Sequence, residues 1–129
     1  MPTITDAKIA RSLVLLDGVR TLKDSIIDRE EFECEIPSEF TVMLGLFAKG
    51  KPAEAFSFSV DVLSHMFKPI WSNVEHIAIP DDGSNLEMYL KIPIPVLDIG
   101  PNYIVCKFDS AEVWRQRIFF ARKIRRPNA

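Results

Sequence analysis

A chain of 129 residues has the usual size of one domain, and folding at that length can bury roughly two thirds of the surface that the unfolded chain exposes. The hydrophobic share of 47% and the charged share of 26% exclude a disordered chain, and no apolar run approaches the roughly 18 residues that cross a bilayer. A net charge of −2 gives no overall attraction to nucleic acid.

The first segment with a clear preference is 9–16, which is almost continuously apolar. Such a run is typical of a strand covered on both sides or of a short helix, and we favour the strand. Later segments alternate apolar and other residues with a period of two, the pattern of a strand that buries one face. In chain order they are 32–36, 40–46, 56–62 and 86–92. We also predict strands at 74–79, 103–108 and 113–121; in the last of these, Trp114, Ile118 and Phe120 share one face with Gln116.

Turn residues separate these segments, and no amphipathic helix of any length lies between them. The turn groups are 17–18, 49–52, 80–85 and 100–102. Pro93 and Pro95 must end the strand before them or lie on a sheet edge, because proline cannot donate to a ladder. We therefore predict an all-β fold, an antiparallel β-sandwich of about seven to nine strands. It forms a single domain over residues 1–124, followed by a short basic tail at 125–129.

Three short motifs accompany the predicted strand boundaries. They are Leu16-Asp17-Gly18-Val19-Arg20 after the opening strand, Pro37-Ser38-Glu39-Phe40 before a central strand, and Gly100-Pro101-Asn102-Tyr103 at the entry to a late strand. Together they resemble a family of small bacterial domains of unknown function with an immunoglobulin-like β-sandwich. The resemblance spans residues 7–122 and implies an immunoglobulin-like fold in a bacterial or phage protein, but no chemistry.

The two cysteines, Cys34 and Cys106, lie far apart in apolar-patterned segments. We expect both to be small buried core residues, with a disulfide or a reactive thiol as the alternatives. The positions of Tyr103 and Trp71 relative to the cysteines differ from those in extracellular immunoglobulin domains, which argues against the disulfide. The first residues do not resemble a secretory signal, so we expect a cytoplasmic protein with reduced thiols.

The residue types of known chemical sites occur without the required spacing. His65 and His76 lack further metal ligands. Asp61, Ser64 and His65 include the residue types of a hydrolytic triad, but neighbours on one strand point to opposite faces and cannot share a proton path. The acidic turn at 80–85 lacks the pattern of a calcium loop, and no glycine-rich phosphate loop is present. We therefore expect no catalytic residue, metal site or cofactor, and predict that the protein is not an enzyme.

The segment 66–71 is a candidate surface for a partner protein. It contains Phe67, Ile70 and Trp71 in a predicted inter-strand connection. These side chains either close one open end of the sandwich or serve as anchors for a partner, because Trp and Phe are enriched at the centres of interfaces.

Charge is distributed unevenly along the chain. Acidic residues gather in 24–39, whereas bases gather near the C-terminus and include Arg122, Lys123, Arg125 and Arg126. The two segments could face each other within the fold or between copies of a homo-oligomer, and solvated charge without a role is the third reading. The sequence thus predicts a non-enzymatic protein-interaction or assembly module. The alternative is an anion- or nucleic-acid-binding module at the basic end, although we expect neither nucleic acid nor a membrane as the partner.

Overall fold

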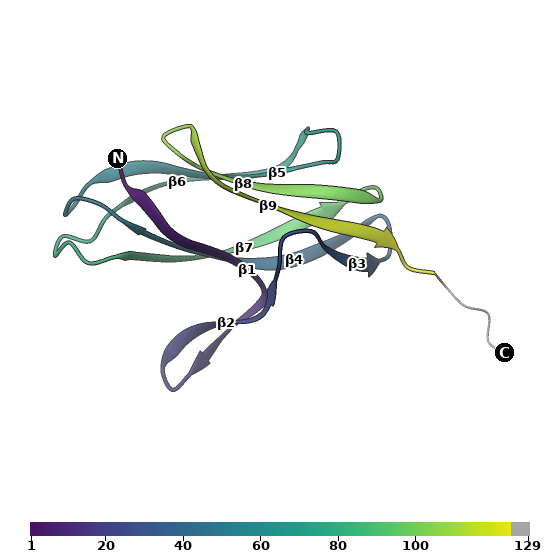
Figure 1. Ribbon diagram of the computed structural model, residues 1–129, viewed down its shortest axis with the longest axis horizontal. Helices are drawn as coiled ribbons and strands as arrows, with labels where there is room; N and C mark the ends of the chain where they lie inside the picture. Colours follow the sequence, from purple (N-terminus) through teal and green to yellow (C-terminus); the bar gives the residue numbers. More distant parts are fainter. Residues whose placement is uncertain (125–129) are drawn as a thin grey trace.

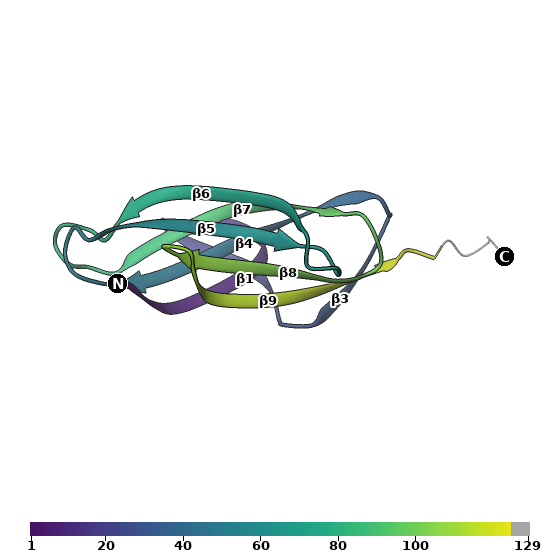
Figure 2. The same ribbon diagram turned by 90° about the horizontal axis from the view of Figure 1, so that it is seen from above.

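The computed structural model describes residues 1–124, which form nine β-strands in two packed sheets, one above the other in Figure 1. The first sheet has the order β2-β1-β4-β7 and the second β3-β9-β8-β5-β6; Figure 2 shows the second sheet from above. The predicted all-β sandwich is confirmed. The strands are β1 (Thr3–Leu16), β2 (Val19–Ile26), β3 (Glu30–Cys34), β4 (Ser38–Lys49), β5 (Ala55–Leu63), β6 (Pro69–Ala78), β7 (Leu86–Val96), β8 (Gly100–Phe108) and β9 (Ala111–Arg122).

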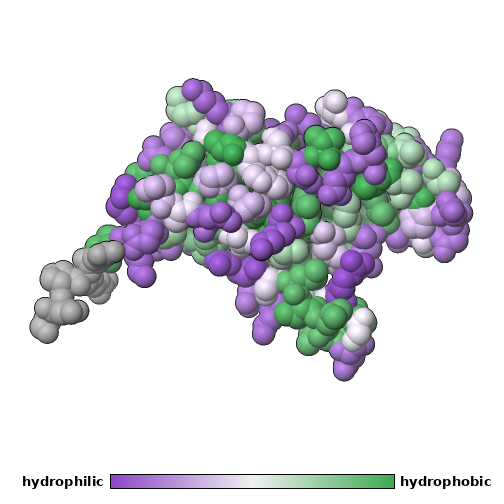
Figure 3. Space-filling model, turned by 180° about the vertical axis from the view of Figure 1, so that it is seen from behind, coloured by the Kyte–Doolittle hydropathy of each residue, from purple (hydrophilic) through white to green (hydrophobic). Residues whose placement is uncertain are grey.

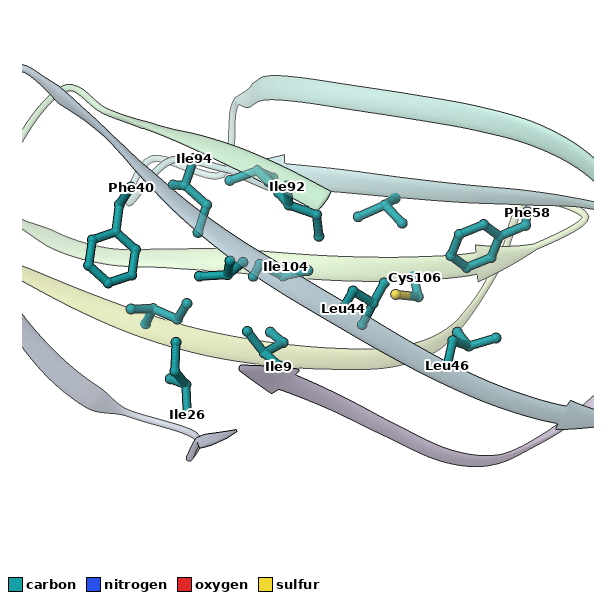
Figure 4. Close-up of a cluster of buried hydrophobic side chains, with 14 of the residues drawn as sticks. Ile9, Ile26, Phe40, Leu44, Leu46, Phe58, Ile92, Ile94, Ile104 and Cys106 are labelled. Atoms are coloured by element: carbon teal, nitrogen blue, oxygen red, sulfur yellow. The ribbon is translucent and has the colours of Figure 1, made fainter. Parts of the chain in front are cut away.

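The core lies between the two sheets and consists of the apolar half of each alternating strand (Figure 4). In β5, for example, every second residue from Phe56 to Val62 is buried. Fully burying a large apolar side chain contributes about 1.5–3 kcal/mol relative to leaving it exposed, so this alternation determines which face of each strand points inward. Cys106 is buried in the core and Cys34 is half-buried against it, both as free thiols. Within residues 1–124 there is no helix of the length and apolar character needed to span a membrane.

The prediction that the sandwich is antiparallel throughout is wrong for one pair of strands. β3 runs parallel to β9, with Phe32 opposite Phe120 and Cys34 opposite Arg122, so the five-stranded sheet is mixed. Burial alternates with the same period in parallel and antiparallel strands, and the pattern of 32–36 therefore carries no information on direction. Two parallel neighbours need a long connection between them. Here the chain between β3 and β9 contains the five strands β4 to β8.

β1 and β2 form a hairpin that extends away from the two layers (Figure 1). β1 pairs with β4 only as far as Ala10 opposite Met43, and its remaining residues pair with β2 alone. Asp17 and Gly18 form the turn with φ of 50° and 78°, as in a two-residue hairpin connection. The run 9–16 is thus a strand as predicted, but only its first two residues, Ile9 and Ala10, pair with β4. β2 was not predicted, because its apolar residues do not alternate.

Turn residues and prolines account for other differences from the predicted boundaries. Residues 100–102, predicted as a turn, begin β8, and the end of the predicted 66–71 connection begins β6. Pro93 and Pro95 lie within β7, which is an edge strand of the first sheet. Of the two predicted positions, the end of a strand or a sheet edge, the structure therefore shows the sheet edge. On an edge strand a missing N–H can face solvent, where it removes no ladder hydrogen bond.

Candidate functional site

The end of the β1–β2 hairpin carries three large apolar side chains in solvent. Leu15, Leu16 and Val19 are 70%, 57% and 64% exposed, and they flank the turn at Asp17. Cross-strand partners share a face, so Leu16 and Val19 lie on one face of the hairpin and Leu15 on the other. Figure 3 shows hydrophobic side chains gathered on the lobe that projects below the sandwich. We call Leu15, Leu16 and Val19 the hairpin tip.

The base of the hairpin, in contrast, is fixed to the sandwich. Gln116 Nε2 of β9 donates a buried hydrogen bond to the carbonyl O of Ile26 at 2.8 Å, which joins the end of β2 to the second sheet. Leu22, midway along β2, also lies so close to Gly45 of β4 that a Cβ added to Gly45 would be 2.6 Å from the Leu22 Cδ1. A fixed base with an exposed apolar end suits an element that presents its tip to another molecule.

The sequence candidates Phe67, Ile70 and Trp71 do not form one exposed surface. Ile70 and Trp71 belong to β6 and are half-buried against the core, rather than lying in the connection. Phe67 lies in the loop before β6 with φ of 60°, is 57% exposed, and stacks on Tyr103 with ring centroids 4.8 Å apart. Phe67 is therefore the member of this set that is most accessible to a partner.

A hollow of about 310 Å³ lies beside this ring pair on the second sheet. Its lining consists of Asp28, Phe67, Tyr103, Arg115 and Arg117. Both arginines have carboxylate partners: Arg115 Nη2 lies 2.6 Å from Glu112 Oε1, and Arg117 Nη2 lies 3.4 Å from Asp28 Oδ2. The backbone N–H of Arg117 also donates to Asp28 Oδ1 at 2.7 Å, and this hydrogen bond is the main cause of the lowered pKa of Asp28. The hollow thus offers an anion two arginines that are already paired.

The basic candidates at the end of the chain are described only in part. Arg122 is exposed at the end of β9 and donates from Nη1 to the carbonyl O of Ile36 at 3.5 Å. The backbone N–H of Lys123 donates to the carbonyl O of Cys34, the last residue of β3, at 2.9 Å. The side chain of Lys123 is exposed. Arg125 and Arg126 lie outside the described residues.

The acidic and basic segments are neighbours within one chain. Glu31 of β3 lies opposite Phe119 of β9, and Glu33 lies opposite Ala121, in the parallel ladder described above. Of the two arrangements that the sequence allows, the fold therefore contains the one in which the acidic and basic segments face each other within one chain. A homo-oligomer held together by these charges stays a prediction. It would require acidic side chains that form no ion pair with β9 of their own chain.

A second hollow, of about 300 Å³ at one end of the sandwich, contains the residue types of a hydrolytic site. Ser64, His65 and Asp98 all line it. Ser64 Oγ, however, accepts hydrogen bonds from two backbone N–H groups of the loop that follows, and Asp98 Oδ1 accepts one from the next residue. These oxygens support turns instead of a proton path between serine and histidine. Across residues 1–124, no three His, Cys, Asp or Glu side chains gather in a way that could hold a metal ion.

Compared with protein-family models and with curated proteins, the chain has no match. Function must therefore be inferred from the surfaces themselves. The hairpin tip is the surface that the sequence candidates missed. An Asp-Gly pair between two apolar runs is a strong signal of a two-residue hairpin, and it would have placed Leu15, Leu16 and Val19 beside an exposed turn.

Proposed function

We propose that the protein is a non-enzymatic protein-interaction module that contacts its partner through the hairpin tip. The observation that carries the proposal is the exposure of Leu15, Leu16 and Val19 on an element that extends from the sandwich. Soluble monomers rarely concentrate large exposed apolar side chains around one projecting turn unless that part of the molecule meets a partner. Each of these side chains would contribute about 1.5–3 kcal/mol if it became fully buried in the complex.

Asp17 favours a protein partner over a lipid bilayer. It lies in the turn between Leu16 and Val19, so any surface that receives the tip must also receive its carboxylate. A carboxylate at the bilayer centre costs about 2.5–3.5 kcal/mol on insertion scales. A protein pocket can instead supply a cation or a backbone N–H at its rim. We therefore propose a partner with an apolar pocket that is bordered by a hydrogen-bond donor.

We also propose an immunoglobulin-like class for the sandwich and a bacterial or phage protein of the cytoplasm. In support of the class, β1, β4 and β7 are neighbours in one sheet, and β9, β8, β5 and β6 in the other. The same neighbours occur among the A, B and E strands and the G, F, C and C′ strands of immunoglobulin domains. Two free thiols support a reducing compartment, and the three sequence motifs support the bacterial or phage origin.

Site-specific photo-cross-linking in cells of the source organism tests the hairpin proposal. A photoreactive amino acid at Val19 should give discrete adducts with one or a few proteins. Ala111 is the matched control position, because it is also the exposed first residue after a two-residue hairpin turn, at the other end of the chain. Adducts that are the same at both positions, or none at Val19, would contradict the proposal.

A double substitution in the same experiment separates contact from folding. Leu15→Ser with Leu16→Ser should abolish the Val19 adducts and leave thermal unfolding close to that of the wild type, because both side chains are exposed in the free protein. Flotation of the wild-type protein with lipid vesicles, lost in this variant, would contradict the choice of a protein partner.

The alternative function is anion or nucleic-acid binding at the basic end of β9. Arg122 and Lys123 are exposed there, and Arg125 and Arg126 follow in the sequence. We rank it second because the acidic strand β3 lies directly beside β9 and lowers the local positive potential. Retention on a polyanion that weakens with salt, and is lost when all four bases become Ser, would support this alternative; indifference to salt would count against it.

A further inference from the structure

Among the described residues, two polar side chains are buried: Asn102 at 5% exposure and Gln116 at 8%. They lie on neighbouring strands, β8 and β9, and differ in their hydrogen bonds. Gln116 donates to the carbonyl O of Ile26, whereas no hydrogen bond within residues 1–124 involves the side chain of Asn102. We propose that the amide of Asn102 is the base of a binding site for a ligand that carries a primary carboxamide. This site is separate from the hairpin tip and does not depend on it.

Asn102 belongs to the inward face of β8. Burial alternates along this strand, and Asn102 continues the inward row of Ile104, Cys106 and Phe108. Its apolar neighbours in the row have no polar side-chain group to satisfy, whereas Asn102 brings two N–H donors and a carbonyl acceptor. A buried polar group without a partner is costly, and most such groups in folded proteins are hydrogen-bonded. The unpartnered amide therefore points to a role outside the contacts of the fold.

The amide of Asn102 opens onto the hollow of about 300 Å³ at one end of the sandwich, because Asn102 is one of the residues that line it. Within residues 1–124, no side-chain nitrogen or oxygen is both fully enclosed and without a partner, so the unbonded amide of Asn102 must reach the space of the hollow. A space of this volume is at the lower end of the range for small-molecule sites. A small ligand can therefore reach the donor and the acceptor of Asn102.

Two loops at the same end of the sandwich form the walls of the hollow. They connect β5 to β6 and β7 to β8, and both lie on the side of the molecule toward which the C-terminus points (Figures 1 and 2). The loops approach each other closely, since a Cβ added to Gly100 would be 3.7 Å from the Cβ of His65. The residues that line the hollow beside Asn102 are Ser64, His65, Lys68, Ile70, Leu97 and Asp98.

The β5–β6 loop is held in place by its own contacts. The N–H of Ser64 donates to the carbonyl O of Lys68 at 2.8 Å, and the N–H of Phe67 donates to the carbonyl O of Ser64 at 2.8 Å. The ring of Phe67 stacks on that of Tyr103, the residue after Asn102. Consecutive strand residues point to opposite faces, so this stacking fixes the loop from outside while Asn102 faces the hollow. The hollow is therefore preformed, which lowers the entropy cost of binding.

The charges at the rim favour a neutral ligand. Lys68 and Asp98 carry opposite charges, and neither forms an ion pair within the described residues. With histidine counted as neutral, the rim has one cation and one anion, which leave no net attraction for a charged ligand. Ile70 is half-buried and Leu97 is 62% exposed, and both supply apolar surface. The ligand that fits is a neutral polar group on a small apolar body.

A primary carboxamide matches the amide of Asn102 at both polar atoms. Its carbonyl O and one N–H lie side by side on one edge, so two such amides can form two hydrogen bonds with each other. A peptide group cannot do this, because a trans peptide holds its N–H and C=O on opposite sides. A carboxylate accepts from the Asn102 N–H but places its second oxygen against the Asn102 carbonyl O. A free carboxamide and the side chain of Asn or Gln in another protein are the two sources of the group.

An NMR titration of the isotope-labelled full chain tests the proposal. Isovaleramide should shift the side-chain NH₂ signals of Asn102 in a saturable way. Isovalerate and isobutyl methyl ketone have the same shape but no amide N–H, and each should bind about tenfold more weakly. N-Acetylglutamine N-methylamide distinguishes the two sources. An affinity equal to that of isovaleramide assigns the carboxamide to a protein side chain, and binding of isovaleramide alone assigns it to a small molecule.

Two variants separate binding from folding. Asn102→Leu keeps the branched shape of the side chain and should weaken isovaleramide binding about tenfold or more. It should be at least as stable in urea as the wild type, because it breaks no hydrogen bond of the fold. Gln116→Met is the matched control: Gln116 is the other buried amide and does not line the hollow. This variant should bind isovaleramide like the wild type but be less stable, because the carbonyl O of Ile26 loses its donor.

Three binding results would overturn the proposal: no shift of the Asn102 NH₂ signals, equal affinities for isovaleramide and the ketone, or unchanged binding in Asn102→Leu. A loss of stability in Asn102→Leu as large as that in Gln116→Met would also overturn it, since the amide of Asn102 would then have a partner within the chain.

Discussion

Replacing Gln116 by Met tests how firmly the base of the hairpin is fixed to the second sheet. Gln116 is 8% exposed, and its Nε2 donates to the carbonyl O of Ile26 at 2.8 Å. Ile26 is itself buried at the end of β2, so water cannot readily replace the lost donor. Methionine has a similar length and volume, and the exchange therefore removes the hydrogen bond without opening a large cavity.

The magnitude follows from the carbonyl group that is left without a donor. An unsatisfied buried polar group costs about 1–3 kcal/mol, and burying a thioether in place of an amide offsets part of that cost. We therefore expect the free energy of unfolding to fall by about 1–2 kcal/mol. With a urea m value of about 1.5 kcal/mol per molar, the unfolding midpoint should move down by roughly 1 M.

Urea unfolding followed by tryptophan fluorescence measures this shift, because Trp71 and Trp114 are both packed against the core. Arg115→Met is the control, since Arg115 is the exposed neighbour of Gln116 and its ion pair contributes about 0–1 kcal/mol. Trypsin should also cleave after Arg20 faster in Gln116→Met than in the control. A midpoint within about 0.3 M of the wild type at unchanged m would refute the reasoning.

Phe108→Ala should lower the free energy of unfolding by about 3–5 kcal/mol, because its buried ring contacts two other phenylalanine rings; a loss below about 1 kcal/mol in urea unfolding would argue against that packing. Burial raises the pKa of the Cys106 thiol from 9.0 to about 12, so the unfolded thiol ionises first and stability should fall as the pH rises above 9.0. Cys106→Ala should flatten this alkaline loss, and equal slopes for the two proteins would contradict it. The Arg117 N–H holds the pKa of Asp28 below its ordinary 3.8, so this group stabilises the fold above that pH and the contribution is lost as the pH falls through the folded pKa. Asp28→Asn should therefore reduce the acid sensitivity of thermal unfolding, whereas an unchanged acid limb would show that the contact contributes nothing.

The sequence by itself determined most of the strands and their inward faces. The alternation at 40–46, 56–62 and 86–92 specified which side chains are buried, because a strand that buries one face must place apolar residues at every second position. The same local pattern placed Gln116 on a face with Ile118, where the structure finds both buried. It also identified Phe67 as a candidate anchor.

The surfaces that carry the proposals were decided by the tertiary structure alone. Leu15 and Leu16 belong to an apolar run that predicts a covered strand, and they are exposed because β1 parts from β4 at Ala10. That departure also ends the pairing of β1 with β4 at Met43. Likewise, β3 lies parallel to β9 because of where the chain enters the second sheet. Residue alternation is a local property of the sequence that repeats every two positions. The neighbour and the direction of a strand instead depend on contacts between segments far apart in the chain, and these contacts exist only once the chain has folded.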